Sequence, residues 1–275
     1  MTMRPDPTAT DEVLYSVDSH VATITLNAPE RLNAFGPELL AAWAHYIRQS
    51  SEDDNVRVVI VTGAGRAFCA GGNVRRRAEQ GARSDTARSA IERRNGLRLG
   101  VHRVPQALQY LDKPYIAAVN GAAAGGGMDM AMQADIRFAS EQARFGMSYV
   151  NIGLAPGDGG CWLLPRYVGI AKALHLIWTG EMIDAQEALR LGLVSRVIPH
   201  DSLMDETYAY AHQLAEGPPI AMQIAKRLVY LGERLSFVET LDITQPAMTV
   251  VQSTEDSREG PLAFAEKRKP EFKGR

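Results

Sequence analysis

Strands are the first feature to emerge from the pattern of apolar and polar positions along the chain. Val21–Leu26 alternates apolar residues with threonine, the period of two that is typical of a half-buried strand. Val56–Val61 is a β-branched run that ends just before glycines. Strands are predicted at Val21–Leu26, Val56–Val61, Tyr115–Val119, Ile136–Ala139 and Arg144–Gly146, with a helix at Pro37–Arg48. This alternation of strands and helices predicts an α/β fold.

The pattern changes after residue 200 to a longer helical periodicity. Apolar residues recur at helical spacing in three segments, which are separated by Gly217-Pro218-Pro219 and by Gly232. The predicted helices are Leu203–Leu214, Ile220–Leu231 and Phe237–Val251. We therefore expect two regions, an α/β core over residues 1–200 and a helical C-terminal region over residues 201–275.

Composition and charge narrow the class of protein. The 275 residues include 30 basic and 32 acidic side chains, so the strongly basic surface of a general nucleic-acid binder is not expected. Two cysteines, Cys69 and Cys161, supply neither a disulfide framework nor a four-cysteine zinc site. No apolar stretch is long enough for a signal peptide or a membrane span, so we expect a cytoplasmic protein with no membrane contact.

One charged segment departs from this even composition. Residues 75–94 carry seven arginines and few apolar residues. Such a segment favours a solvated helix or a mobile loop beside the core, and a phosphate-binding or lid role is the alternative.

The most informative motif is a strand that runs through three consecutive glycines into an apolar helical pattern, between Asn120 and Met132. The first N–H groups of a helix have no partner within it and lie at the positive end of its dipole, so they can bind an oxyanion. Glycine allows a ligand to approach this backbone closely. The motif therefore outlines an oxyanion hole. The alternative is a tight strand–helix junction that packs without a ligand.

A second glycine junction, Gly65 to Val74, follows the strand at Val56–Val61 and could supply a second N–H donor. Its Gly63-Ala-Gly65 does not complete a dinucleotide fingerprint, because Phe68 stands where the third glycine belongs. Gly146-Met-Ser148-Tyr-Val150 lacks the last glycine of a nucleophile elbow, and no glycine loop is followed by Lys-Ser or Lys-Thr. The six histidines are scattered, so no metal site and no separate cofactor are predicted.

The two junctions, Arg66-Ala-Phe-Cys-Ala-Gly-Gly-Asn-Val and Ala118-Val-Asn-Gly through Gly-Gly-Gly-Met-Asp, resemble the paired signatures of the crotonase (enoyl-CoA hydratase/isomerase) superfamily. Further blocks resemble it over nearly the whole chain, from Pro29-Glu-Arg-Leu-Asn-Ala to residues 263–275. The resemblance implies a spiral of repeated β-β-α units, a helical C-terminal region at an oligomer interface, and a homotrimer or a hexamer of two trimers. It also implies a CoA thioester substrate.

Carried over residue by residue, the resemblance assigns binding roles. The N–H groups of Gly72 and Gly126 are expected to hold the thioester oxygen, where they would stabilise an enolate most as its charge develops. Asn73 departs from the aspartate more often seen at its position, which leaves the adenine pocket open. The basic tail favours CoA phosphate binding, with a solvated C-terminus as the alternative. The residues expected to contact CoA are Arg31, Leu32, Ala34, Ala70, Asn73, Val74, Phe272 and Lys273.

The catalytic positions differ from the two glutamates of typical hydratases. Asp129 stands at the first position and Tyr149 at the second, and a phenol with an ordinary pKa near 10 is a poor general base at neutral pH. Asp158, in a nearby loop, offers a replacement carboxylate. We hypothesise that Asp129 and Asp158 form the acid/base pair and that Tyr149 is a hydrogen-bonding or proton-donating partner. The alternatives are a helix-dipole role for Asp129, a turn or cap for Asp158 and core packing for Tyr149.

The functions that follow are ordered by this pattern. The first is an enoyl-CoA hydratase or isomerase that acts through a thioester enolate on an unsaturated acyl-CoA, with cyclic and dienoyl acyl groups among the candidates. The second is hydrolysis or decarboxylation of a β-oxo acyl-CoA, and the third is a non-catalytic CoA-binding or RNA-associated scaffold. The side chains of Met130, Met132, Met147, Tyr149 and Trp162 line the acyl pocket in one interpretation and belong to the core in the other.

Overall fold

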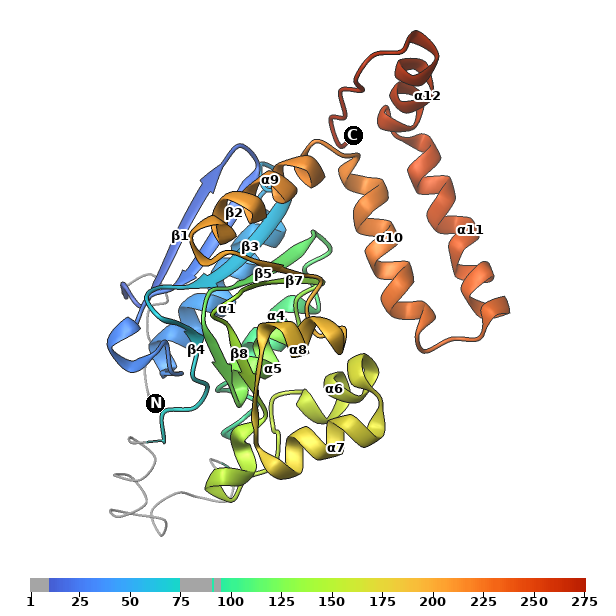
Figure 1. Cartoon of the computed structure of the whole chain (residues 1–275). Coiled ribbons are helices and arrows are strands. Elements are labelled where there is room, and N and C mark those ends of the chain that lie inside the picture. The colour runs from blue at the N-terminus through green and yellow to red at the C-terminus, as the bar shows by residue number, and fades with distance from the viewer. Residues whose placement is uncertain (1–9, 75–90, 92–94) are drawn as a thin grey trace.

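Two sheets organise the protein, whose computed structural model describes residues 10–74, 91 and 95–275 (Figure 1). In the larger sheet, with the order β1-β2-β3-β5-β7-β10, only the β1–β2 pair is antiparallel. Its strands are β1 (Val13–Asp18), β2 (Val21–Leu26), β3 (Val58–Gly63), β5 (Tyr115–Val119), β7 (Ile136–Ser140) and β10 (Arg196–Ile198). The smaller sheet comprises β4 (Ala67–Cys69), β6 (Ala122–Ala124), β8 (Arg144–Gly146) and β9 (Met182–Asp184).

Helices and 3-10 turns connect and cover these strands. The 3-10 turns are η1 (Pro29–Arg31), η2 (Ser148–Ile152) and η3 (His200–Ser202). The helices are α1 (Pro37–Glu52), α4 (Arg103–Leu108), α5 (Gly126–Met132), α6 (Gly160–Val168), α7 (Ile170–Thr179), α8 (Ala185–Arg190), α9 (Leu203–Ala215), α10 (Pro219–Gly232), α11 (Phe237–Ser253) and α12 (Asp256–Glu266).

The winding of the chain confirms the predicted spiral of β-β-α units. The pairs β3–β4, β5–β6 and β7–β8 each send one strand to the larger sheet and the next to the smaller sheet. Successive units lie side by side in both sheets, in the order β3-β5-β7 and β4-β6-β8. This repetition brings the ends of equivalent strands, and the loops that follow them, to one edge of the molecule.

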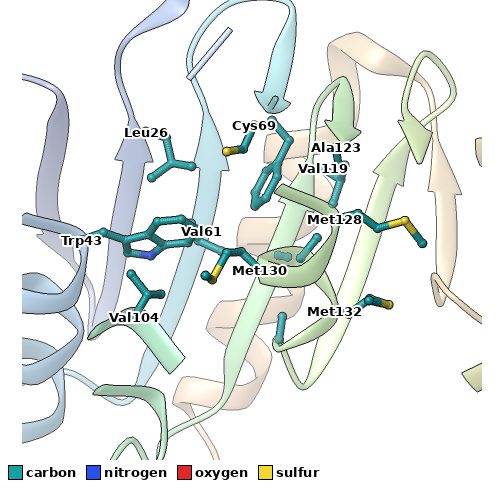
Figure 2. Close-up of a cluster of buried hydrophobic side chains, with 14 of the residues drawn as sticks. Leu26, Trp43, Val61, Cys69, Val104, Val119, Ala123, Met128, Met130 and Met132 are labelled. Carbon is teal, nitrogen blue, oxygen red and sulfur yellow. The ribbon is translucent and has the colours of Figure 1, made fainter. Parts of the chain in front are cut away.

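The core explains why the central strands read as continuous apolar runs. In β3, Val59 and Val61 pack on one face with α1 and α4, whereas Val58 and Ile60 pack on the other face with α9. A parallel strand covered on both faces needs apolar residues at every position. Figure 2 shows side chains from β3, α1, α4 and α5, Trp43 among them, meeting in the first of these clusters.

The predicted strands and helices lie where expected, with β3 displaced two residues toward the C-terminus. The sequence pattern did not reveal β1 or the short strands β4, β6, β9 and β10. The charged segment 75–94 falls, apart from Ile91, outside the described residues. Within the described part of the chain, no helix combines the length and apolar character needed to cross a membrane.

The C-terminal helices divide into two groups. Helix α9 packs on β2, β3, β5 and β7, so it belongs to the layer that covers the sheet. Helices α10 to α12 project from this body (Figure 1), and no residue of α10 or α11 is buried. Polar contacts hold α10 to the core: Lys226 Nζ lies 2.8 Å from Asp135 Oδ2, and the Tyr230 hydroxyl donates to Asp135 Oδ1 over 2.8 Å. The predicted boundary at residue 200 remains a prediction.

Candidate active site

The first wall of the site is built by two loops that pair through their backbones. Ala70 N donates to Leu32 O over 2.9 Å, and Phe35 N donates to Gly71 O over 2.7 Å. The buried side chain of Asn33 locks the pair, because its Oδ1 accepts from Ala28 N and its Nδ2 donates to Ala67 O, both over 2.8 Å. The predicted CoA-contacting residues near positions 31–34 and 70–74 are thereby brought together.

The two glycine junctions meet at this wall. Gly71 has φ of +77°, and a Cβ there would lie 2.8 Å from Gly126 N, so this backbone touches the start of α5. Gly72 is exposed, and a Cβ there would meet nothing within 4 Å. Gly126 is the first residue of α5, where an N–H group has no partner in the helix. The predicted donors thus lie in neighbouring segments, one of them facing open space.

Beside Gly126 lies a cluster of three polar side chains, Asp129, Tyr149 and Asp158, which we call the acid–tyrosine cluster. The Tyr149 hydroxyl lies 2.6 Å from Asp129 Oδ2 and 2.9 Å from Asp158 Oδ2. A Cβ on Gly126 would lie 2.8 Å from Asp158 Oδ2. The structure therefore brings together the three predicted catalytic residues and places one carboxyl oxygen next to a predicted oxyanion donor.

A count of protons constrains the charge of this cluster. A tyrosine hydroxyl has one proton and can donate to one acceptor at a time, whereas an ionised carboxylate can only accept. Two short contacts at the Tyr149 oxygen therefore need a second proton, which a carboxyl group must supply. The acid–tyrosine cluster holds two protons and one negative charge in its hydrogen-bonded state.

Burial and charge distinguish the two carboxyl groups. Asp129 is fully buried, and burial raises the pKa of its carboxyl to about 7, although the hydrogen bond from Tyr149 opposes this rise. Asp158 is 8% exposed. Burial also raises the pKa of Asp158, against the Tyr149 hydrogen bond and the positive charge of His102. Burial likewise raises the pKa of Tyr149, so its phenol remains protonated.

The Asp158 loop is anchored by two residues that the sequence did not single out. His102 Nε2 lies 2.8 Å from Gly157 O, and Gln133 Nε2 donates to Asp158 O over 3.1 Å. Gln133 caps the end of α5, the helix that carries Asp129. In the sequence His102 was one of six scattered histidines, and no local pattern signals a contact with a loop 55 residues away.

The predicted CoA contacts fall into two places. Arg31 lies at the first wall, where its Nη2 is 2.6 Å from Glu12 Oε2. Phe272 lies elsewhere, because its carbonyl oxygen accepts from Arg57 Nη2 over 3.1 Å and Arg57 precedes β3. Gly72 follows the other end of that strand, about 20 Å away at 3.3 Å per residue. One chain therefore does not bring Phe272 and Lys273 to the other predicted contacts.

The remaining candidates separate into core and surface. Met130, Met132 and Met147 are fully or almost fully buried in the main core cluster, as Figure 2 shows for the first two. Trp162 is 41% exposed, with Arg166 stacked on its ring. The ring of Tyr149 packs against the core, so it combines packing with its polar contacts. No group of three potential metal ligands occurs among the residues that the structure describes.

Comparison with known proteins places the whole arrangement. The family model for enoyl-CoA hydratase/isomerase matches residues 16–275. The chain is 38% identical to the short-chain-enoyl-CoA hydratase of Clostridium acetobutylicum over 96% of this chain and 99% of that one. It is 36% identical to the 1,2-epoxyphenylacetyl-CoA isomerase of Escherichia coli over 96% and 98%.

Solved structures agree with this assignment. The enoyl-CoA hydratase of Bacillus anthracis matches with a TM-score of 0.88 and 34% identity, over 96% of this chain and 100% of that one. The spiral of β-β-α units is therefore shared with a structure determined by crystallography. The chain belongs to the enoyl-CoA hydratase/isomerase family and is an enzyme of that family.

Proposed function

We propose that this enzyme binds the CoA thioester of an unsaturated acid and hydrates or moves its double bond through a thioester enolate. The observation that carries the proposal is the acid–tyrosine cluster beside Gly126. Proton transfer next to a thioester requires an acid and a base within reach of one carbon, and a donor for the oxygen that becomes negative. The cluster and the two glycine junctions supply all three.

The backbone N–H groups of Gly72 and Gly126 are the proposed oxyanion donors. The resemblance to the family selects them, and the close approach of Gly71 to Gly126 supports the selection. Removal of a single donor of this kind costs about 100- to 1000-fold in rate in enzymes where it has been measured. Because the donors belong to the backbone, they are independent of side-chain identity, and the surrounding side chains select the reaction.

For hydration, we assign the base to Asp158 and the proton source to Tyr149 and Asp129. Asp158 takes a proton from water as the water oxygen bonds to the β-carbon, and the electrons of the double bond move to the thioester oxygen. The α-carbon then takes the Tyr149 proton, which Asp129 replaces. Return of the proton from Asp158 through Tyr149 to Asp129 restores the cluster, so one water is added and no proton is gained.

The same groups can move a double bond without water. Asp158 then removes a carbon-bound proton from the acyl chain, the enolate forms at the donors, and Tyr149 delivers a proton to a different carbon. Relatives support both outcomes, since one is named a hydratase and another an isomerase. The name of that isomerase includes a phenyl ring, which agrees with a bulky or cyclic acyl group here.

The direct test is mass spectrometry of the products from straight-chain, dienoyl, cyclic enoyl and β-oxo acyl-CoAs in heavy-oxygen water and deuterium oxide. One added water in an intact chain establishes hydration, whereas deuterium incorporation with a moved double bond and no water establishes isomerisation. Cleavage or loss of carbon dioxide from the β-oxo compounds favours the second function. Asp158→Asn should abolish turnover, and unchanged turnover in this variant would exclude Asp158 as the base.

We also propose that the protein assembles as a homotrimer or a hexamer. The supporting observation is apolar surface on helices that little of the chain covers: Ile170 and Trp178 of α7 are 72% and 70% exposed, and Phe264 of α12 is 87% exposed. Assembly would also allow Lys273 of one copy to serve the CoA site of another. In analytical ultracentrifugation, Ile170→Glu should shift the protein to a smaller species, whereas Val17→Glu on β1 should not. An unchanged assembly in Ile170→Glu would refute this interface.

A further inference from the structure

His102 joins the active site from an element that the catalytic proposal does not use. It lies immediately before α4, and its position is fixed by backbone bonds from His102 N to Leu97 O and from Gln106 N to His102 O, each 3.0 Å long. Its half-buried ring reaches the loop that carries Asp158, where Nε2 lies 2.8 Å from Gly157 O. The ring thus fixes the residue next to the proposed base.

The partner of Nε2 determines the protonation of the ring. A carbonyl oxygen can only accept a hydrogen bond, so Nε2 carries a hydrogen and Nδ1 is the nitrogen that gains a proton when the ring becomes charged. A histidine with an ordinary pKa of about 6.5 is partly charged near neutral pH. His102 can therefore keep its hydrogen bond to Gly157 in both charge states while its charge changes.

The charge of His102 acts unequally on the two carboxyl groups. Among the described residues, three titratable groups act on Asp158 or are acted on by it besides His102, namely Asp129, Tyr149 and the buried thiol of Cys69. His102 is the cation of this set and lowers the pKa of Asp158. The charged group that acts on Asp129 is Asp158, which has the same sign and raises its pKa.

This asymmetry fits an otherwise unexplained atom. Asp129 Oδ1 is buried and has no hydrogen-bond partner in the described part of the chain. An unpartnered oxygen is costly on a buried carboxylate and much less costly on a neutral carboxyl group, whose proton can lie on Oδ2 and point to Tyr149. The cluster therefore favours a proton on Asp129 and the negative charge on Asp158.

We propose that His102 is a positioning residue that holds the Asp158 loop and keeps the negative charge of the acid–tyrosine cluster on Asp158, leaving Asp129 as the group that carries the proton. The proposal rests on the proposed function for its catalytic meaning, since it decides which carboxyl group is base and which is acid. Two carboxyl groups that differ in burial and in charged neighbours can hold different protonation states at one pH.

The test separates the charge of His102 from its hydrogen bond. His102→Gln can still donate to Gly157 O but has no charge, whereas His102→Leu loses both. The matched control is His20→Asn, since His20 is an exposed histidine that also contacts a backbone carbonyl, that of Asn55, from the β1–β2 turn. Circular dichroism and thermal unfolding establish that each variant is folded.

The first readout needs no substrate. Infrared difference spectroscopy of the purified enzyme across pH follows the carbonyl band of protonated carboxyl groups, and the band that disappears in Asp158→Asn identifies Asp158. We expect its midpoint to rise by about one pH unit in His102→Gln, the lower end of the effect of a nearby opposite charge. It should stay in place in His20→Asn. An unchanged midpoint in His102→Gln overturns the proposal, whichever acyl-CoA the enzyme uses.

The second readout uses a substrate identified by the acyl-CoA panel. In His102→Gln, the acid limb of the pH profile of kcat/KM should move upward with the infrared midpoint, while kcat on the plateau stays within about twofold. In His102→Leu the plateau should also fall by about tenfold or more, because the loop is no longer held. Equal plateau losses in both variants without a shifted limb would show a merely structural role. Absence of turnover across the panel would refute the proposed function but leave the infrared result decisive for His102.

Discussion

Removal of one hydroxyl group, in Tyr149→Phe, tests the acid–tyrosine cluster most sharply. The ring of Tyr149 packs against the core, and phenylalanine preserves that packing while deleting the atom that lies 2.6 Å from Asp129 Oδ2 and 2.9 Å from Asp158 Oδ2. The two carboxyl oxygens lie no farther apart than the sum of these two distances. Without the hydroxyl, no donor stands between them.

The size of the effect follows from that separation. Two unit charges about 5.5 Å apart repel by about 3 kcal/mol at an effective dielectric constant of 20. This repulsion corresponds to about two pKa units. The hydrogen bond from Tyr149 lowers the pKa of both carboxyl groups, so its loss acts in the same direction as the repulsion. Asp158 should therefore keep its proton to a higher pH in the variant.

The assay is the pH profile of kcat and kcat/KM with the substrate identified by mass spectrometry. We expect the acid limb of Tyr149→Phe to move upward by about one to two pH units. The plateau of kcat should fall about 100-fold, the lower end of what a positioned acid contributes. The control is Tyr167→Phe, which deletes a partly buried hydroxyl that donates to Met132 O over 3.1 Å. A wild-type limb and plateau in Tyr149→Phe would refute the shared-proton interpretation.

Three further predictions test separate parts of the site. Gly126→Ala should lower kcat/KM by about 100-fold, because its Cβ would lie 2.6 Å from Phe35 Cε2 and displace an oxyanion donor, whereas Gly232→Ala in α10 should leave it unchanged. The raised pKa of Asp129, about 7, adds stability that is complete below about pH 4 and lost as the pH rises through 7. Urea unfolding of Asp129→Asn should therefore lose less stability than wild type between pH 5 and pH 8, and parallel losses would contradict the assignment. Asn33→Ala should lower the free energy of unfolding by about 3 kcal/mol, since several buried backbone groups lose their partner, and a loss below 1 kcal/mol in urea unfolding would contradict this.

Sequence patterns predicted the central sheet well because burial on both faces imposes a strong local signal. Val58 to Val61 are apolar at every position, and the structure places them in two separate core clusters. The three-residue strands β4, β6 and β9 were not recognised, since three residues are too few to establish a period of two. Their existence depends on pairing between units of the spiral, which local pattern does not contain.

The candidate site was partly predictable for a similar reason. Asp129, Tyr149 and Asp158 lie within 30 residues of one another and beside recognisable glycine motifs, so their association could be expected. The contact between His102 and Gly157 depends on how two distant loops meet, and no motif announces it. Phe272 and Lys273 match a family pattern, but a single sequence does not tell which copy of the chain they serve.

The central claim is that the acid–tyrosine cluster transfers protons at the carbons of an acyl-CoA thioester. Its most direct test is the mass of the products formed from the acyl-CoA panel in heavy-oxygen water and deuterium oxide, by wild type and by Asp158→Asn side by side. The account predicts that wild type adds one water to an unsaturated acyl-CoA, or incorporates deuterium while moving its double bond, and that Asp158→Asn does neither. Equal product formation by the two proteins, or no change in any acyl-CoA with wild type, would contradict it.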